Sequence, residues 1–275
     1  MYPISLYMSN VLQGVYMKTV SISLQKGGVG KTTLAVSLAV ELAKENGSVV
    51  LVDADPQGNS SSWIGPDLLD HELADVLTAK KEDQATLLEK TVLKTGIPGL
   101  YLLPTIGLSG GLKPFENIAR DRPGCFRGIV AGLENMGFRY CVFDLSPAFG
   151  PIEKAALIAS QEVITPVMPD AFGLDGLKIF SNNMKELKDT LEEMGLSMPA
   201  YSKICINAID NRIRQHREIL AKMREYGESF SLYEIPVDPS FRKGQGVGLT
   251  VQELSIAKKE TLSTLYKLAK DLMEA

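Results

Sequence analysis

A glycine-rich loop with two lysines carries the residue types that bind phosphate. Residues 25–33 read Q-K-G-G-V-G-K-T-T, but the general pattern G-x-x-x-x-G-K-[ST] has a glycine where Gln25 stands, and Lys26 is an extra cation. Backbone N–H groups of the glycines can close around phosphate oxygens, Lys31 adds positive charge, and the Thr32 hydroxyl can bind Mg²⁺. We therefore predict that the following residues bind a phosphate ligand: Gly27, Gly28, Val29, Gly30, Lys31, Thr32 and Thr33.

The residues that flank the loop predict a strand before it and a helix after it. Residues 19–24 alternate in polarity, as in a strand, and residues 33–45 have helical character with Gly47 as the C-cap. A helix N-terminus would then face the phosphates, where its dipole favours negative charge.

Two further apolar runs end in aspartates. Residues 48–52 precede Asp53 and Asp55, and residues 139–143 precede Asp144. Ligands of open α/β sheets bind beyond the carboxyl ends of the strands, so these carboxylates are expected beside the phosphate loop. Asp144 can accept hydrogen bonds from Mg²⁺-bound water, and Asp53 is expected near the loop and the metal. The predicted metal site therefore comprises Thr32, Asp53 and Asp144.

Together these segments resemble the ParA/MinD superfamily of ATPases. The string K-G-G-V-G-K-T-T is similar to the deviant Walker A loop of that superfamily, and D-A-D-P-Q-G-N at residues 53–59 is similar to its switch I. The resemblance implies that ATP and Mg²⁺ are bound, that Lys26 crosses a homodimer interface to the partner's nucleotide, and that Asp55 orients the attacking water. Lys26, Lys31 and Asp55 are thus the predicted catalytic residues.

The segment after Asp144 resembles the D-x-P-P switch II of the same superfamily, with one departure. Ser146 stands where a first proline is common. This departure concerns the geometry of the switch and leaves the assignment of Asp144 unchanged.

The second half of the chain continues the alternation of strands and helices. Residues 163–169, 203–207 and 231–236 read as strands, and residues 176–187 read as a helix. The resemblance implies that Asn207 and the loop with Pro236 and Asp238 flank the adenine, whose edge an Asn amide can match. A polar strand end is the alternative for Asn207.

Length and composition predict the architecture. With 275 residues, 45% of them hydrophobic, the chain can form one doubly wound α/β domain of the P-loop NTPase type, with a mostly parallel sheet, over residues 17–275. Residues 1–16 contain no Lys or Arg and are predicted to be either a short N-terminal extension or the result of a misplaced start codon, neither a signal peptide nor a membrane span. The spacing of Cys125, Cys141 and Cys205 suggests free thiols in a reducing cytoplasm.

The formal net charge of −4 argues against bulk electrostatic attraction to DNA, but basic residues are concentrated locally. Residues 212–224 contain five Arg or Lys against one acid, and two more basic residues follow the last strand. The resemblance implies non-specific DNA binding through these regions, and a solvated helix face is the alternative. The predicted DNA-binding residues are Arg212, Arg214, Arg217, Arg242 and Lys243.

The combined interpretation is a partition ATPase of the ParA/Soj type in the cytoplasm, associated with the nucleoid. The resemblance implies slow intrinsic hydrolysis that a ParB-like protein stimulates. Alternatives are a MinD-like membrane ATPase, a protein-cargo positioning ATPase and a metabolic P-loop enzyme. The first would need its amphipathic C-terminal segment on a membrane, but that segment has a mixed polar face, which favours packing on the body.

Overall fold

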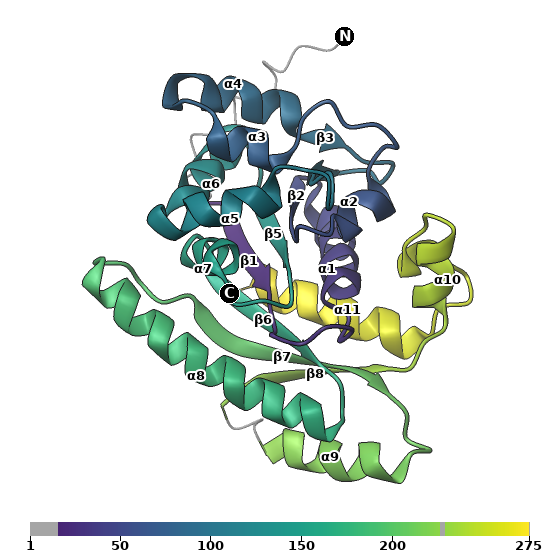
Figure 1. Cartoon of the computed structure of the whole chain (residues 1–275). Coiled ribbons are helices and arrows are strands. Elements are labelled where there is room, and N and C mark those ends of the chain that lie inside the picture. Colours follow the sequence, from purple (N-terminus) through teal and green to yellow (C-terminus); the bar gives the residue numbers. More distant parts are fainter. Residues whose placement is uncertain (1–15, 226–228, 275) are drawn as a thin grey trace.

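A sheet of eight strands runs through the part of the chain that the computed structural model describes, residues 16–225 and 229–274 (Figure 1). The strands are β1 (Lys18–Ile22), β2 (Val49–Ala54), β3 (Leu93–Lys94), β4 (Leu100–Leu103), β5 (Tyr140–Leu145), β6 (Glu162–Val167), β7 (Ala200–Ile209) and β8 (Ser231–Pro236). Their order across the sheet is β3-β4-β2-β5-β1-β6-β7-β8, and only the β3–β4 pair is antiparallel. The predicted doubly wound α/β domain is therefore confirmed.

Helices cover both faces of this sheet. They are α1 (Lys31–Asn46), α2 (Asn59–Ile64), α3 (Leu73–Thr78), α4 (Lys81–Thr91), α5 (Leu112–Asp121), α6 (Cys125–Asn135), α7 (Pro151–Ile158), α8 (Ala171–Glu193), α9 (Arg214–Arg224), α10 (Ser240–Gly246) and α11 (Lys259–Met273), with a 3₁₀ turn η3 (Val251–Glu253). The side chains of β2 alternate between the two faces: Val49 and Leu51 join the apolar cluster of α1 and α11, whereas Val50 and Val52 join that of α3 and α5 to α8.

The carboxyl ends of the central strands gather the predicted site residues. β1 lies between β5 and β6, and β5 pairs with β2, so the phosphate loop after β1 is next to the strand that carries Asp144 near its carboxyl end. Asp53 of β2 stands directly beside Asp144 of β5 in the strand register. The topology thus brings together residues that are far apart in the sequence.

The C-terminal helix packs on the body of the protein. Leu265, Leu268, Ala269 and Leu272 of α11 are buried against α1 and the sheet. This agrees with the packing interpretation of the amphipathic segment. Among the described residues, none of the helices has the length and apolar character needed to cross a lipid bilayer.

Several boundaries differ from the sequence-based expectation. Strands β3 and β4 were not predicted, β7 begins three residues before the expected 203, and α8 runs well beyond the expected 176–187. Cys141 and Cys205 are buried free thiols in strands and Cys125 is a free thiol in α6, as predicted. Residues 1–15 of the predicted N-terminal extension lie outside the described residues.

Candidate nucleotide-binding site

The glycine-rich loop is shaped by two left-handed residues. Gly28 has φ 73° and Gly30, the N-cap of α1, has φ 92°, a region that glycine adopts without the steric cost of a Cβ. A Cβ at Gly30 would also lie 2.4 Å from Nδ2 of Asn207, whereas a Cβ at Gly27 or Gly28 would meet nothing within 4 Å. The loop therefore packs tightly on its inner side and leaves room for a ligand beside Gly27 and Gly28.

Lys31 lies inside the loop. Its Nζ donates to the carbonyl of Lys26 at 2.8 Å, and the residue is only 7% exposed. Burial lowers the pKa of Lys31, and the negative charges of Asp144, Asp55 and Glu153 oppose that shift. An ammonium group held in this way is placed for an anionic ligand, because loop N–H groups and the α1 N-terminus surround the same space.

Asp53 and Asp144 are fully buried and adjacent. Burial raises the pKa of Asp53 to about 6, although Ser61 donates to its Oδ2 from both N and Oγ, at 2.8 and 2.7 Å. Burial and the neighbouring charge of Asp53 raise the pKa of Asp144 to about 8, while the Thr32 side chain opposes the shift. Two carboxylates in this setting favour protonation or a nearby cation.

One oxygen of Asp144 is available to accept a hydrogen bond from the water shell of such a cation. Its Oδ2 accepts a hydrogen bond from Ser60 Oγ at 3.0 Å, but its buried Oδ1 has no hydrogen-bond partner among the described residues. The same part of the chain has no group of three or more His, Cys, Asp or Glu that could hold a metal by itself. The donor set therefore fits Mg²⁺, which binds through few protein ligands together with phosphate oxygens and water.

Asp55 stands at the edge of this buried pair. It is 5% exposed, its Oδ1 accepts the Gln57 N–H at 2.9 Å, and its own N–H donates to Asp53 Oδ1 at 3.3 Å. The loop after β2 thus holds the carboxylate in one orientation close to Lys31, whose pKa it influences. Its predicted role towards water remains a prediction.

Lys26 projects away from the loop and makes its contacts within its own chain. Its Nζ lies 2.8 Å from Oδ1 and 3.1 Å from Oδ2 of Asp170, and 5.7 Å from the ring centre of Phe172. The Lys26 side chain is 23% exposed. The predicted contact with a partner's nucleotide would require Lys26 to leave Asp170.

The residues predicted for adenine lie beside the loop. Asn207 donates from Nδ2 to the Val29 carbonyl at 3.0 Å and accepts the Ala208 N–H at 2.8 Å, so its amide braces the loop. Pro236 ends β8. A small pocket in this region is lined by Gly30, Thr33, Leu34, Pro166, Cys205, Asn207, Ile235, Phe241 and Leu265.

Asp238 has a clear structural task. Its Oδ1 accepts from N and Oγ of Ser240 at 3.0 and 2.6 Å, and its Oδ2 accepts from Lys258 N and Thr261 Oγ1 at 2.9 and 2.8 Å. Burial alone would raise the pKa of Asp238, but these hydrogen bonds outweigh it and the pKa is lowered. The carboxylate thus joins the starts of α10 and α11, and any contact with adenine stays a prediction.

The predicted DNA-binding residues are exposed and form two separate groups. Arg212 precedes α9 and Arg214 and Arg217 lie on it, whereas Arg242 and Lys243 lie on α10, and Figure 1 shows the two helices apart.

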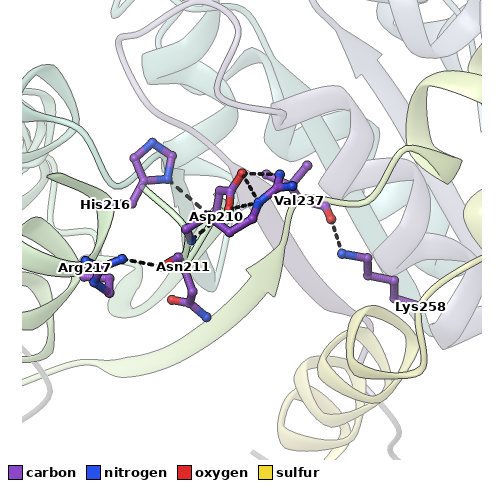
Figure 2. Close-up of polar contacts among 7 residues, drawn as sticks. Asp210, Asn211, His216, Arg217, Val237 and Lys258 are labelled. Carbon is purple, nitrogen blue, oxygen red and sulfur yellow. Dashed lines mark hydrogen bonds and ion pairs between the residues drawn. The ribbon is translucent and has the colours of Figure 1, made fainter. Parts of the chain in front are cut away.

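Some of these charges already have acidic partners. Arg212 pairs with Asp210 at 2.6 Å and Arg214 with Glu218 at 2.7 Å. Arg217 donates instead to the Asn211 carbonyl at 2.6 Å (Figure 2). No acid forms an ion pair with Arg217, Arg242 or Lys243 in the described part of the chain.

Sequence reasoning missed several residues that organise the site. Ser60 and Ser61 of α2 hold the two buried aspartates, and Asp170 both pairs with Lys26 and caps α8 by accepting from Gly173 N. Lys258 is a further cation close to the segment before α9. Its Nζ donates to the Val237 carbonyl at 2.7 Å (Figure 2), and the Val237 N–H donates to the Ile209 carbonyl. The available signals were the three serines at positions 60–62, directly after switch I, and an aspartate just before a helix.

A strand, a glycine-rich loop with a buried lysine, a helix and two adjacent carboxylates define a P-loop nucleotide-binding protein. A family model described as "AAA domain" matches residues 17–196. The sporulation initiation inhibitor protein Soj of Bacillus subtilis is 34% identical over 172 residues, which cover 61% of this chain and 65% of Soj. The chromosome partitioning protein ParA of Caulobacter vibrioides is 30% identical over 194 residues, covering 68% and 71%.

The solved structures agree with this fold. A complex of a Cyanothece McdA variant with ATP has a TM-score of 0.78 at 19% identity and covers 95% of this chain and 98% of that chain. The family model and the ParA relative show that the chain belongs to the ParA/Soj family of partition ATPases.

Proposed function

We propose that two copies of this chain close around ATP, that the closed dimer binds DNA without sequence preference, and that a ParB-like protein stimulates hydrolysis and release. The observation that carries the proposal is Lys26. Lys31 alone occupies the interior of the loop, while Lys26 points outward and is partly exposed. A second loop lysine with no task in its own phosphate cradle is suited to neutralise phosphate charge across an interface.

The proposed ATP and Mg²⁺ site uses the residues that converge on the loop. Loop N–H groups and Lys31 would hold the phosphates, with Thr32 as metal ligand and Asp53 and Asp144 beside it. Bound Mg²⁺ would supply positive charge against the phosphates. Asp55 would orient water, and its fixed position at the end of β2 supports that role.

The adenine would lie between the end of β7 and the loop after β8. Asn207 lines a small, mostly apolar pocket in that region, which would have to widen to admit a base, and Pro236 ends β8. Because Asp238 uses both oxygens within the chain, its contribution would be to hold this loop in place.

The proposed DNA contact depends on the unpaired basic side chains. Arg217, Arg242 and Lys243 are exposed, and no described acid neutralises them. A few phosphate contacts give each subunit weak affinity, and a dimer that engages two such surfaces binds far more tightly. The protein would therefore act in the cytoplasm on the nucleoid when ATP holds it closed.

Of the alternatives, the membrane ATPase loses its main support. The apolar face of α11 is buried against α1 and the sheet, so an interfacial anchor would require that helix to detach.

Co-sedimentation with ATP separates these classes. The protein is mixed with random-sequence duplex or with anionic liposomes, each with Mg²⁺ and either ATP or ADP. The proposal predicts that the protein sediments with DNA in the presence of ATP but not of ADP. With liposomes it should stay in the supernatant with either nucleotide. Sedimentation with liposomes alone would favour the membrane class, and sedimentation with neither would refute the DNA-based function.

A further inference from the structure

One buried carboxylate holds both ends of segment 146–150, which links β5 to α7. Glu153, in the first turn of α7, accepts a hydrogen bond from the Ser146 hydroxyl at Oε1 and from the Gly150 N–H at Oε2, the latter at 2.9 Å. Ser146 Oγ also accepts the Ala148 N–H at 3.2 Å. The segment begins two residues after Asp144, so its shape decides which backbone atoms follow that aspartate.

The placement of Glu153 is costly for a residue that only caps a helix. Glu153 is 3% exposed, and burying a carboxylate is unfavourable unless its oxygens are satisfied. The capping contact with Gly150 uses only one oxygen, and the other holds the hydroxyl at the far end of the segment. Glu153 also raises the pKa of Lys31 against the effect of burial, which places its charge near the phosphate loop.

Because position 146 is a serine, the backbone of the segment needs another constraint to hold its shape. A proline at position 146 would fix φ by itself, whereas serine leaves that dihedral free. Between the two anchors, Pro147 and Ala148 are exposed to solvent. On the outer side, a Cβ at Gly150 would lie 3.0 Å from Glu116 Oε1 of α5, so a side chain at position 150 would be crowded.

We propose that Glu153 and Ser146 are positioning residues for ATP hydrolysis: they clamp segment 146–150 in one geometry beside the phosphate site. This inference rests on the proposed ATPase function. The clamp acts on the rate of hydrolysis and not on nucleotide affinity, because neither residue belongs to the phosphate loop.

Four variants test the clamp by activity: Glu153→Ala, Ser146→Ala, the double variant and Glu153→Gln. Each alanine variant should lower kcat about 10-fold, since misplacing reacting groups is expensive, and should keep the ATP Kd within about two-fold. The double variant should be no slower than the slower single variant, because both remove one clamp. Glu153→Gln should retain most activity, since its amide can accept from Gly150 N–H and donate to Ser146 Oγ.

Glu116→Ala is the matched control. Glu116 lies against the same segment and carries the same charge, but its ion pair is with Lys113. Its loss should leave kcat unchanged. Unchanged kcat in both alanine variants, additive losses in the double variant, or a Glu153→Gln variant as slow as Glu153→Ala would each overturn the clamp.

Hydrogen exchange without nucleotide gives a readout that does not depend on ATP. The amides of residues 148–150 should exchange faster in both alanine variants and at the wild-type rate in Glu153→Gln. Equal exchange in all proteins would refute the clamp. If the wild-type protein neither binds nor hydrolyses ATP, the proposed function fails, while the exchange experiment still decides whether the clamp exists.

Discussion

The phosphate cradle and the basic surface of α9 and α10 both depend on charge, yet they differ in burial. In the cradle Lys31 is 7% exposed and Asp53 and Asp144 are 0% exposed, whereas the side chains of Arg212 and Arg214 are 88% and 85% exposed. Charges interact much more strongly in a low dielectric than in water. A single substitution should therefore be decisive in the cradle, while the surface acts through the sum of many weak contacts.

The largest effect is expected for Lys31→Ala. Removing the buried ammonium leaves the phosphates without their main cation, so ATP affinity should fall at least about 100-fold, the cost of a desolvated charged hydrogen bond. Titration calorimetry with Mg²⁺ and ATP measures this, with circular dichroism to verify folding. Lys44→Ala, an exposed lysine at the other end of α1, is the control. Normal affinity in Lys31→Ala would contradict the phosphate-loop assignment.

Asp55→Ala should separate hydrolysis from binding. Because Asp55 is proposed to orient water and not to hold nucleotide, the variant should bind ATP, form the dimer and stay on DNA while turnover falls about 100-fold or more. Phosphate release and DNA sedimentation measure the two properties on the same sample. If ATP binding is lost instead, Asp55 belongs to the metal or structural scaffold.

The sequence predicts the phosphate cradle better than it predicts the short strands at the edge of the sheet. The loop and the aspartates Asp53, Asp55 and Asp144 could be placed because loop chemistry and strand ends are local patterns, and a parallel sheet brings such ends together. β3 and β4 were missed because they are two and four residues long and provide too short a pattern.

Contacts between distant residues had no local pattern. The Lys26–Asp170 pair spans 144 positions and the Asn207–Val29 hydrogen bond spans 178. The acidic partners of Arg212 and Arg214 are local by contrast, because Asp210 lies two residues before Arg212 and Glu218 lies four residues after Arg214, and sequence reasoning overlooked this signal. Ser146 was noticed only as a departure from a motif, because its partner Glu153 is defined by the fold.

The basic surface should respond gradually. If Arg217 and Arg242 each contact one phosphate per subunit, alanine at either position removes two contacts from a dimer. The slope of log K against log[salt] should then become shallower by about 2, at roughly 0.9 per phosphate. Measurements use ATP-bound protein and random-sequence duplex, with Lys94→Ala on the opposite edge strand β3 as the control. Unchanged slopes in both arginine variants would place the DNA surface elsewhere.

The smallest effect is expected in the pH dependence of the protein's thermal stability. The folded-state pKa of Asp53 is about 6 and that of Asp144 about 8, both above the ordinary 3.8, so the folded state binds more protons than the unfolded state between roughly pH 4 and 8. These groups therefore make the nucleotide-free protein less stable as pH rises through that window.

Asp144→Asn should weaken this dependence, so its Tm should fall by several degrees less than the wild-type Tm between pH 5 and pH 8. Thermal unfolding without nucleotide or Mg²⁺ measures both proteins, and Asp121→Asn is a control at the end of α5. Parallel curves for wild type and Asp144→Asn would show that the buried pair does not titrate in this range.

Light scattering with ATP tests the central claim, that Lys26 acts across an interface. Asp55→Ala, which should retain ATP, provides the background in which wild-type Lys26, Lys26→Gln and the control Lys44→Gln are compared. The account predicts that Lys26→Gln binds ATP with unchanged affinity and remains a monomer, whereas the other two become dimers. A dimer of the same stability in Lys26→Gln would contradict the account and leave Lys26 as the partner of Asp170 alone.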